Sequence, residues 1–502
     1  MKKFSPAFDK RRKRRIIYND DCGQLYNATE TDVVDDQSFL DSRTTPLFGT
    51  HVDTYAWCVG NGADPPYNRG SSNQPFLSCL GSEWRAADLI IEACHAHDVE
   101  VWASLRMNDI HDSFMADTLE TTNDPMKAKH PEWLIGTLKD RDKLAEALIE
   151  RSLWSAFNFE HKEVRNHRLN FIKKNAANHD FDGYELDFTR FVWDFPLGRE
   201  IELAPLMTDL VRQIRKLLNQ IGERRGRPYT LVVHVLDSPE KSLLLGQDVE
   251  AWLKEGLIDV LIVGMGYLPY ALRLDQWKTL GDQYEVPVYP SLNANTFIHP
   301  LNDLTKRFNR ISAYYEAIRA AAAWWLYGGA DGIYAFNLFD DMSDNGTKTK
   351  ALISQVLTEV GDVAVLADKD KIYGIGSANR GGFCHHGCET SPLPTPLGKI
   401  ERKLPLTIGP DADKPNVQFT VHFWSTGGND NTQVYMRVNH KLLQPIKTGD
   451  ASEGWRHYIA KVDTKQMRAG VNELSLWCNL DITEMPTPLI VHEVLVEAKH
   501  GM

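Results

Sequence analysis

Short runs of β-branched and aromatic residues alternate with longer amphipathic stretches over most of the chain. The runs have the length of buried strands, and the stretches between them repeat apolar residues at helical spacing. Eight strands are predicted in this way, at residues 16–19, 49–57, 99–105, 181–188, 229–235, 258–264, 286–291 and 332–336. Helical patterns cover residues 83–97, 166–179, 201–221, 247–255 and 309–327. Strand and helix units in this number predict an α/β fold, a (β/α)8 TIM barrel over residues 16–368.

Three of the connections that follow strands are too long for simple turns. They span residues 20–48, 60–82 and 108–163. In a (β/α)8 barrel these connections lie at the C-terminal ends of the strands, where active sites are built. The long connections therefore predict the working face of the barrel.

The pattern changes after residue 368. Residues 369–405 are rich in Gly, Pro and small polar residues, which predicts a linker or a wrap-around loop. Short β-type runs then return without long helical patterns, at residues 417–424, 433–438, 455–462, 473–477 and 489–497. We expect a C-terminal β-sandwich domain over residues 406–502.

Composition and charge restrict the classes of partner. Of the 502 residues, 42% are apolar and 25% are charged, as in soluble globular proteins. The net charge is 56 minus 68, or −12, which repels phosphate backbones, so no nucleic-acid partner is expected. The longest apolar run, residues 320–327, is too short to cross a membrane.

The chain begins with a basic segment. Residues 1–15 include the run Arg11-Arg12-Lys13-Arg14-Arg15, which predicts a solvated arm, with an address label or a nucleic-acid arm as alternatives. No apolar run follows Lys2 and Lys3, which indicates a cytoplasmic protein or one whose export signal has been removed.

Seven scattered cysteines do not predict a disulfide framework in a chain of this length. Residues 384–388, with the sequence Cys-His-His-Gly-Cys, offer four ligands that zinc accepts. The adjacent histidines tend to point apart, so a Gly-rich loop with free thiols or a local disulfide is favoured over a metal site. We expect no metal and no cofactor.

The strongest chemical signal is the fourth strand with the residues after it, FDGYELDFTR at residues 181–190. Alternate side chains share a face of a strand, so Glu185 and Asp187 point together. Two inward carboxylates near the end of a barrel strand are costly unless they are paired or used in catalysis. We interpret Asp187 as catalytic. Glu185 is either a second catalytic carboxylate or the partner of a cation inside the barrel.

This region resembles a known family. Residues 158–165 (NFEHKEVR), followed by a helix and then residues 181–190, are similar to the fourth-strand region of uncharacterised bacterial glycosyl hydrolase-like (β/α)8 proteins. More distantly, Phe-Asp-Gly followed by spaced acids resembles the chitinase pattern, although Thr189 replaces the acid-donating Glu of that pattern. Residues 434–439, 469–474 and 491–496 resemble the accessory jelly-roll modules of glycosidases. The resemblance implies a glycoside hydrolase with a poly- or oligosaccharide substrate.

Cleavage of a glycosidic bond needs an acid that protonates the leaving oxygen and a carboxylate that attacks the sugar or activates water. Asp187 suits the nucleophile or the base. The acid stays open between Glu185, Asp237 and Glu240, because the last two follow the fifth strand and would span the pocket better.

Other strand ends supply candidate substrate ligands, and for each a loop hydrogen bond or core packing is the alternative. The polar candidates are Arg106, Asn108, His111, Arg190, His234, Asn293 and Asn337, and the aromatic rings that could stack on sugars are Trp57, Trp193, Tyr267 and Tyr270. Arg106 and Arg190 suit a uronate or sulfated sugar, or else they neutralise Asp187 and Glu185.

Two further classes of function stay open. The barrel could bind carbohydrate without catalysis, or it could be a metal-dependent hydrolase that uses barrel His and Asp residues. The second class is disfavoured because no early strand carries a His-x-His pair.

Overall fold

The computed structural model describes residues 12–20, 35–60, 83–145, 149–266, 269–293, 304–310, 312–336, 354–376, 390–429, 431–451 and 454–501. Its first part is a closed parallel barrel in which each strand pairs with the next and β8 pairs with β1. The strands are β1 (Ile16–Asp20), β2 (Val52–Cys58), β3 (Glu100–Arg106), β4 (Gly183–Asp187), β5 (Thr230–Val235), β6 (Val260–Val263), β7 (Val288–Asn293) and β8 (Ile333–Phe336). The predicted (β/α)8 fold is confirmed, since every predicted strand is present.

Side chains fill the barrel from inside. A buried interior cluster takes residues from seven of the eight strands: Ile17, Ala56, Trp102, Val232, Val260, Ile262, Tyr289, Tyr334 and Phe336. Strand β4 contributes Gly183 at the level of Trp102, and a Cβ atom there would lie 2.6 Å from the indole ring. The glycine of the Phe-Asp-Gly motif is therefore required by packing around Trp102.

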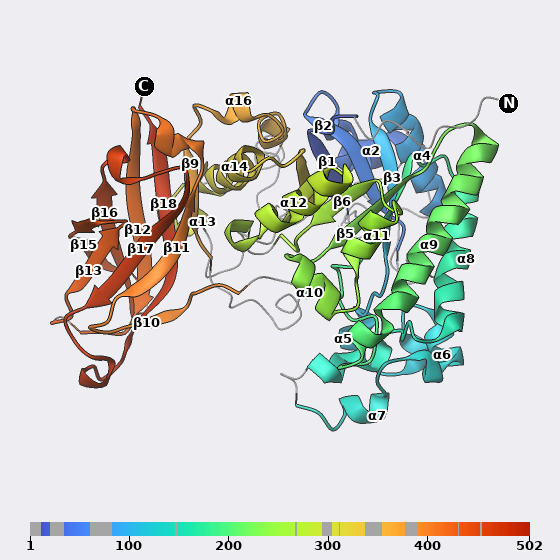
Figure 1. Cartoon of the computed structure of the whole chain (residues 1–502), viewed down its shortest axis with the longest axis horizontal. Coiled ribbons are helices and arrows are strands. Elements are labelled where there is room, and N and C mark those ends of the chain that lie inside the picture. Colours follow the sequence, from blue (N-terminus) through green and yellow to red (C-terminus); the bar gives the residue numbers. More distant parts are fainter. Residues whose placement is uncertain are drawn as a thin grey trace.

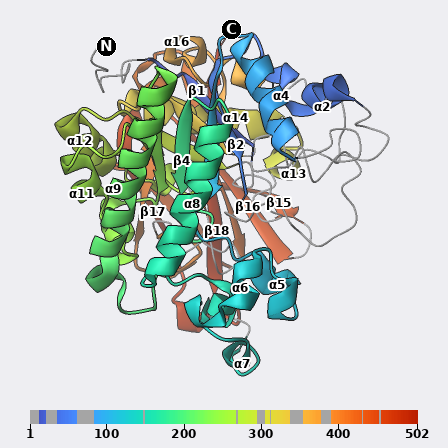
Figure 2. The ribbon, with the colours of Figure 1, turned by 90° about the vertical axis from the view of Figure 1, so that its right-hand side faces the viewer.

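Helices cover the outside of the barrel, as Figure 2 shows for α8 and α9 beside β4. Helix α9 repeats buried apolar residues at helical spacing along its length and ends at Gly226, which has a left-handed conformation with φ of 76°. The main helices are α2 (Asp36–Arg43), α4 (Glu83–His95), α8 (Lys162–Asn178), α9 (Glu200–Arg225), α11 (Val249–Lys254), α12 (Leu274–Tyr284) and α14 (Ser312–Tyr327). Shorter ones are α10 (Pro239–Leu244), α13 (Leu304–Phe308) and α16 (Val363–Leu366).

The connection from β3 to β4 forms a small layer of its own at one end of the barrel (Figure 1). It contains α5 (Asp112–Met115), α6 (Pro125–Lys129) and α7 (Leu138–Arg141). Buried Lys127 of α6 fixes the start of this layer, because its ammonium group donates to Asp112 Oδ2 at 2.7 Å and to the carbonyl of Asp109 at 3.0 Å. The layer lies at the C-terminal ends of the strands, as the length of the connection predicts.

The N-terminal end of the barrel is closed by part of the basic run. Arg14 is buried and donates through Nε to Glu100 at 2.6 Å, and its guanidinium lies over the ring of Trp102. Arg15 makes a two-point ion pair with Asp53. The prediction of a solvated arm is wrong for Arg14, which is buried against Glu100 of β3, whereas Arg15 stays partly exposed beside Asp53 of β2.

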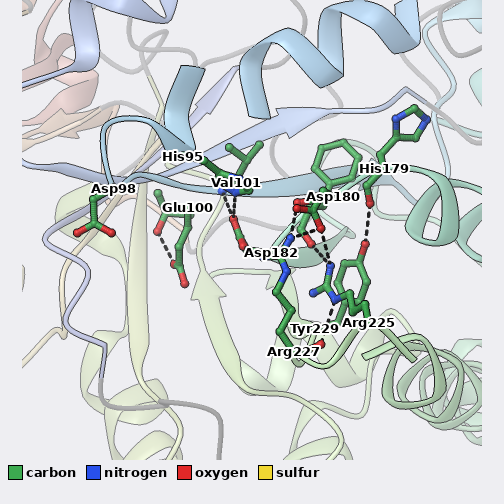
Figure 3. A network of polar contacts seen from close by, with 12 residues as sticks. His95, Asp98, Glu100, Val101, His179, Asp180, Asp182, Arg225, Arg227 and Tyr229 are labelled. Atoms are coloured by element: carbon green, nitrogen blue, oxygen red, sulfur yellow. Dashed lines mark hydrogen bonds and ion pairs between the residues drawn. The ribbon is translucent and has the colours of Figure 1, made fainter. Parts of the chain in front are cut away.

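Asp182 of the Phe-Asp-Gly motif also lies at this end of the barrel (Figure 3). Its Oδ2 accepts hydrogen bonds from His95 Nε2 at 2.8 Å and from the backbone N–H of Val101 at 2.9 Å. Arg227 forms ion pairs with both Asp182 and Asp180. The aspartate of the motif therefore joins β3, β4 and the turn before β5, and it takes no part in the working face.

The C-terminal part is a sandwich of two antiparallel sheets, which confirms the predicted fold class (Figure 1). One sheet has the order β10-β18-β12-β16-β15 with β9 paired to β18, and the other has the order β11-β17-β13-β14. The strands are β9 (Lys371–Ile375), β10 (Thr395–Leu397), β11 (Arg402–Ile408), β12 (Val417–Thr426), β13 (Val434–Val438), β14 (Lys441–Leu443), β15 (Ile446–Ala451), β16 (Trp455–Val462), β17 (Gly470–Cys478) and β18 (Leu489–His500).

Two of these strands lie in the segment predicted as a linker. β9 pairs with β18 from Ile375 to Lys371, and β10 pairs with the start of β18. Hydrogen bonds and ion pairs also join the sandwich to the barrel, since Tyr270 donates to the carbonyl of Ile372 at 2.7 Å and Arg310 to Glu497 at 2.6 Å. Among the described helices, none has the length and hydropathy of a membrane span.

Candidate active site

Three polar residues lie in one row at the C-terminal ends of adjacent strands. In the strand register, Arg106 of β3 pairs with Asp187 of β4, and Asp187 pairs with His234 of β5. Glu185 shares the face of Asp187 one level deeper in the barrel, since residues two apart point the same way. This face is the interior one, because Glu185 accepts a hydrogen bond from Tyr334 of the interior cluster.

Asp187 is held as a hydrogen-bond acceptor by the residues that follow it. Its Oδ1 accepts from the backbone N–H of Thr189 at 2.8 Å, from the Thr189 hydroxyl at 2.8 Å and from the backbone N–H of Arg190 at 3.3 Å. The turn after β4 thus wraps around the carboxylate. These donors hold the carboxylate in one orientation.

Glu185 is enclosed by the barrel. The hydroxyl of Tyr334 donates to its Oε1 at 2.7 Å, and the same oxygen lies 3.7 Å from Nδ1 of His234. The residue has no exposed surface. The structure places Glu185 beside His234 and Tyr334, as an interior partner of both.

The hydrogen-bond partner of Nε2 shows that this nitrogen of the His234 ring carries a proton. Nε2 lies 2.8 Å from the carbonyl oxygen of Gly264, which can only accept, so Nε2 carries a proton. Nδ1 lies 3.2 Å from the Thr189 hydroxyl and 3.6 Å from Asp187 Oδ1. Burial lowers the pKa of His234, and the nearby charge of Asp187 acts in the opposite direction.

A second chain of polar contacts begins at Asp109, in the connection after β3. Asp109 accepts from Arg106 at 2.6 Å and from Nδ1 of His111 at 2.6 Å. Nε2 of His111 then accepts from Arg190 Nη2 at 3.1 Å, and the His111 ring packs edge-on against Phe191. Sequence-predicted Arg106, His111 and Arg190 therefore do come together, with Asp109 as their shared carboxylate.

Burial and the neighbouring cations set the pKa values of Asp109 and His111. Burial alone would raise the pKa of Asp109, but the charges of His111 and Arg106 hold that pKa well below its usual value. Burial lowers the pKa of His111, against the attraction of Asp109 and with the help of Arg190. Arg106 is thus the internal counter-ion of Asp109, whereas Arg190 lies against the imidazole of His111.

Asp237 and Asn293 lie at the ends of neighbouring strands. Asp237, just beyond β5, accepts from the backbone N–H of Met265 at 2.8 Å, and it therefore fixes the turn after β6. Asn293 ends β7, opposite Phe336 of β8, and it is buried. Both residues belong to the C-terminal end of the barrel.

Asn108, which was predicted as a substrate ligand, binds backbone groups through its side-chain amide. Its Nδ2 donates to the carbonyls of Phe157 and Trp193 at 2.8 and 2.6 Å, and its Oδ1 accepts from the N–H of Phe157 at 3.0 Å. The amide joins three stretches of backbone and has its main hydrogen-bonding capacity engaged there. We therefore leave Asn108 out of the substrate site.

The predicted aromatic platform is not assembled by the described residues. Trp57 is 1% exposed and packs against Phe39 in the core between barrel and helices, because it points to the outer face of β2. Trp193 is buried, and the Tyr270 hydroxyl donates to backbone carbonyls. Tyr267 and Asn337 lie outside the described residues.

Sequence reasoning missed three contributors to the site. Thr189 bridges Asp187 and His234, Tyr334 donates to Glu185, and Asp109 organises Arg106 and His111. Thr189 sits two residues after the catalytic candidate, where a hydroxyl can turn back onto a carboxylate, and this spacing was a usable signal. Tyr334 and Asp109 gave no comparable local signal.

Within the described part of the chain, no group of three or more His, Cys, Asp and Glu side chains is placed to hold a metal ion. Residues 384–388, the zinc candidate, lie outside that part.

No family model and no curated protein matches the sequence. Similar solved structures include an α-galactosidase of glycoside hydrolase family 36 from Geobacillus stearothermophilus, at 11% identity and TM-score 0.39. The match covers 96% of this chain and 56% of the galactosidase chain. An α-L-fucosidase from Paenibacillus thiaminolyticus has 13% identity and TM-score 0.42, over 73% of this chain and 51% of its own. A family 18 chitinase from Chromobacterium violaceum has 11% identity and TM-score 0.38, over 96% and 91%. The chain spans little more than half the length of the galactosidase.

Proposed function

We propose that the chain is a glycoside hydrolase that cleaves a poly- or oligosaccharide at the C-terminal end of its barrel. The observation that carries this proposal is the setting of Asp187. Its carboxylate lies inside the barrel at the end of β4, with three donors on one oxygen and a histidine beside it. A carboxylate held in one orientation at the end of a barrel strand suits attack on a sugar or activation of water.

Asp237 is the favoured general acid of this proposal. Glu185 lies one level below Asp187 inside the barrel and accepts from Tyr334, so it is poorly placed to reach a leaving oxygen at the strand ends. Asp237 follows the neighbouring strand β5 and stands at the working end. Glu185 then acts as an interior charge that faces His234.

The substrate of the proposed enzyme carries a negative charge. Arg190 contacts His111 and lies over the ring of Phe336, while Arg106 is engaged by Asp109. A guanidinium donates two parallel hydrogen bonds to a uronate or a sulfate, which is the ligand chemistry that Arg190 suits at this end of the barrel. Arg190 supports the anionic assignment, and Arg106 does not.

The test is a screen of the purified protein against neutral, uronate and sulfated polysaccharides, with release of reducing ends as the readout. Hydrolysis of an anionic glycan by the wild type supports the proposal. Binding of a glycan without turnover would indicate the alternative, a carbohydrate-binding barrel without catalysis. The anomeric configuration of the first product, read by NMR, then separates retention from inversion.

A further inference from the structure

Thr189 stands between two titratable groups, Asp187 and His234, whose facing atoms lie 3.6 Å apart, beyond hydrogen-bond length. Its hydroxyl lies 2.8 Å from Asp187 Oδ1 on one side and 3.2 Å from His234 Nδ1 on the other. All three residues are buried, with Thr189 at 5% exposure. The three side chains form a continuous line from the carboxylate to the imidazole.

The Asp187–Thr189–His234 line has two hydrogen-bond contacts, but the hydroxyl between them supplies only one proton. The Thr189 hydroxyl has one proton and can donate to only one neighbour. The other His234 nitrogen, Nε2, already carries its proton toward the Gly264 carbonyl. If both contacts of the hydroxyl are hydrogen bonds, a second proton is needed. That proton is carried either by the carboxyl group of Asp187 or by Nδ1 of His234.

These two arrangements contain the same number of protons. In the first, Nδ1–H of His234 donates to the hydroxyl and the hydroxyl donates to ionised Asp187. In the second, protonated Asp187 donates to the hydroxyl and the hydroxyl donates to neutral His234. Two protons shift by one hydrogen bond each between the arrangements, no electrons are gained or lost, and the net result moves a proton between Asp187 and His234.

The surroundings bias the two arrangements in opposite directions. The backbone N–H groups of Thr189 and Arg190 hold Asp187 in place, and the Glu185 carboxyl lies 3.7 Å from His234 Nδ1, where it attracts a proton on that nitrogen. Burial disfavours separated charges and favours the neutral pair. The other groups that face His234 are the rings of Tyr334 and Phe336 and the Gly264 carbonyl.

We propose that Thr189 is a positioning residue that passes a proton between Asp187 and His234. The proposal rests on the proposed function for its use in catalysis. When Asp187 must be ionised to attack, its proton moves through the hydroxyl to His234. When Asp187 acts as a base, the proton that it takes from water follows the same route, and the carboxylate is regenerated.

The test follows the protonation of His234 in the full chain without substrate. Protein labelled with ¹⁵N-histidine is titrated, and the Nδ1 signal of His234 is assigned by its loss in His234→Asn. The variants compared are Thr189→Val, which removes the hydroxyl, Thr189→Ser, which keeps it, and Asp187→Asn, which removes the charge at the far end. Thr230→Val is the matched control, because Thr230 is a buried threonine of the same strand as His234 whose hydroxyl has no hydrogen-bond partner among the described residues.

We expect Thr189→Val and Asp187→Asn to move the Nδ1 protonation midpoint of His234 downward by about one pH unit, since the imidazolium loses a charge-assisted hydrogen bond. Thr189→Ser and Thr230→Val should keep the wild-type midpoint. An identical Nδ1 signal in wild type and Thr189→Val at every pH would overturn the proposal. If Thr189→Val does not fold, an Nδ1 signal unchanged in Asp187→Asn overturns it in the same way. This readout needs no turnover, so it stands apart from failure of the proposed glycosidase activity.

Discussion

Nδ1 of His234 lies 3.6 Å from Oδ1 of Asp187, at the same level of adjacent barrel strands. His234 is thus a basic group beside the carboxylate that we propose as catalytic, and it can accept a proton inside a buried site. The same nitrogen lies 3.7 Å from Glu185, so a single imidazole faces both carboxylates of β4. The two acids of the strand therefore differ in role, because one ends the row and the other is enclosed below it.

Arg190→Ala should weaken hydrolysis of a charged glycan selectively. Each charge-assisted hydrogen bond that is lost is worth about 1.5 to 3 kcal/mol, which is at least tenfold in kcat/KM. The measurement compares a sulfated or uronate polysaccharide with its desulfated or carboxyl-reduced form. Equal rates of the wild type on both forms would return Arg190 to the role of an internal counter-ion.

Arg14→Met should destabilise the barrel by about 3 to 5 kcal/mol, because it leaves the carboxylate of Glu100 buried and without its main cation. Urea unfolding of the variant provides the free energy. The double variant Arg14→Met with Glu100→Gln removes the charge as well and should recover part of the loss. A double variant that is additive would show that the ion pair itself contributes little.

His95 provides a pH dependence of stability at the opposite end of the barrel from Asp187. Its hydrogen bond to Asp182 raises the pKa of the imidazole above the ordinary 6.5, so the contribution is fully present below about pH 6.5 and is lost as the pH rises through the folded-state pKa. One third of the His95 side chain is exposed, so solvent screening keeps the effect below about 1 kcal/mol.

The measurement is the unfolding free energy of wild type and His95→Gln between pH 5 and 9. The difference should be largest at acidic pH and should shrink toward pH 9. A difference that grows with pH would contradict the assignment of the His95–Asp182 contact as a charge-assisted bond.

Asn108→Ala should lower stability by at least about 2 kcal/mol, because buried carbonyls of Phe157 and Trp193 lose their donor. Asn108→Asp should also destabilise, since a carboxylate cannot donate to those carbonyls. Thermal unfolding checks both variants. A variant that keeps the wild-type midpoint but loses affinity for a glycan would instead make Asn108 a ligand.

The barrel was predictable because its strands are continuous apolar runs that alternate with amphipathic helices, and both periods are local properties of the sequence. The missed strands include β11, β14 and β15 and the two at 371–375 and 395–397, which are short, stand among glycines and prolines, and pair with β18 by long-range contacts. Arg14 was misread for the same reason, since Glu100 lies 86 positions away.

The candidate site was predictable only where the signal lay within one strand. The alternation in β4 places Glu185 and Asp187 on one face, and the structure agrees. The outward direction of Trp57 and the cross-barrel contact of Tyr334 with Glu185 depend on how eight strands close, which no local pattern encodes. Asn108 shows that a polar residue at a strand end can serve the backbone alone.

A comparison of hydrolysis rates tests whether Asp187 does chemistry on a sugar. Hydrolysis of the best glycan from the screen is measured for wild type, Asp187→Asn and Glu185→Gln, with the unfolding midpoint of each as a control. We predict that Asp187→Asn retains the fold and loses about 10²- to 10⁴-fold or more in kcat, and that Glu185→Gln loses less. Near-wild-type kcat in a folded Asp187→Asn variant would contradict the account.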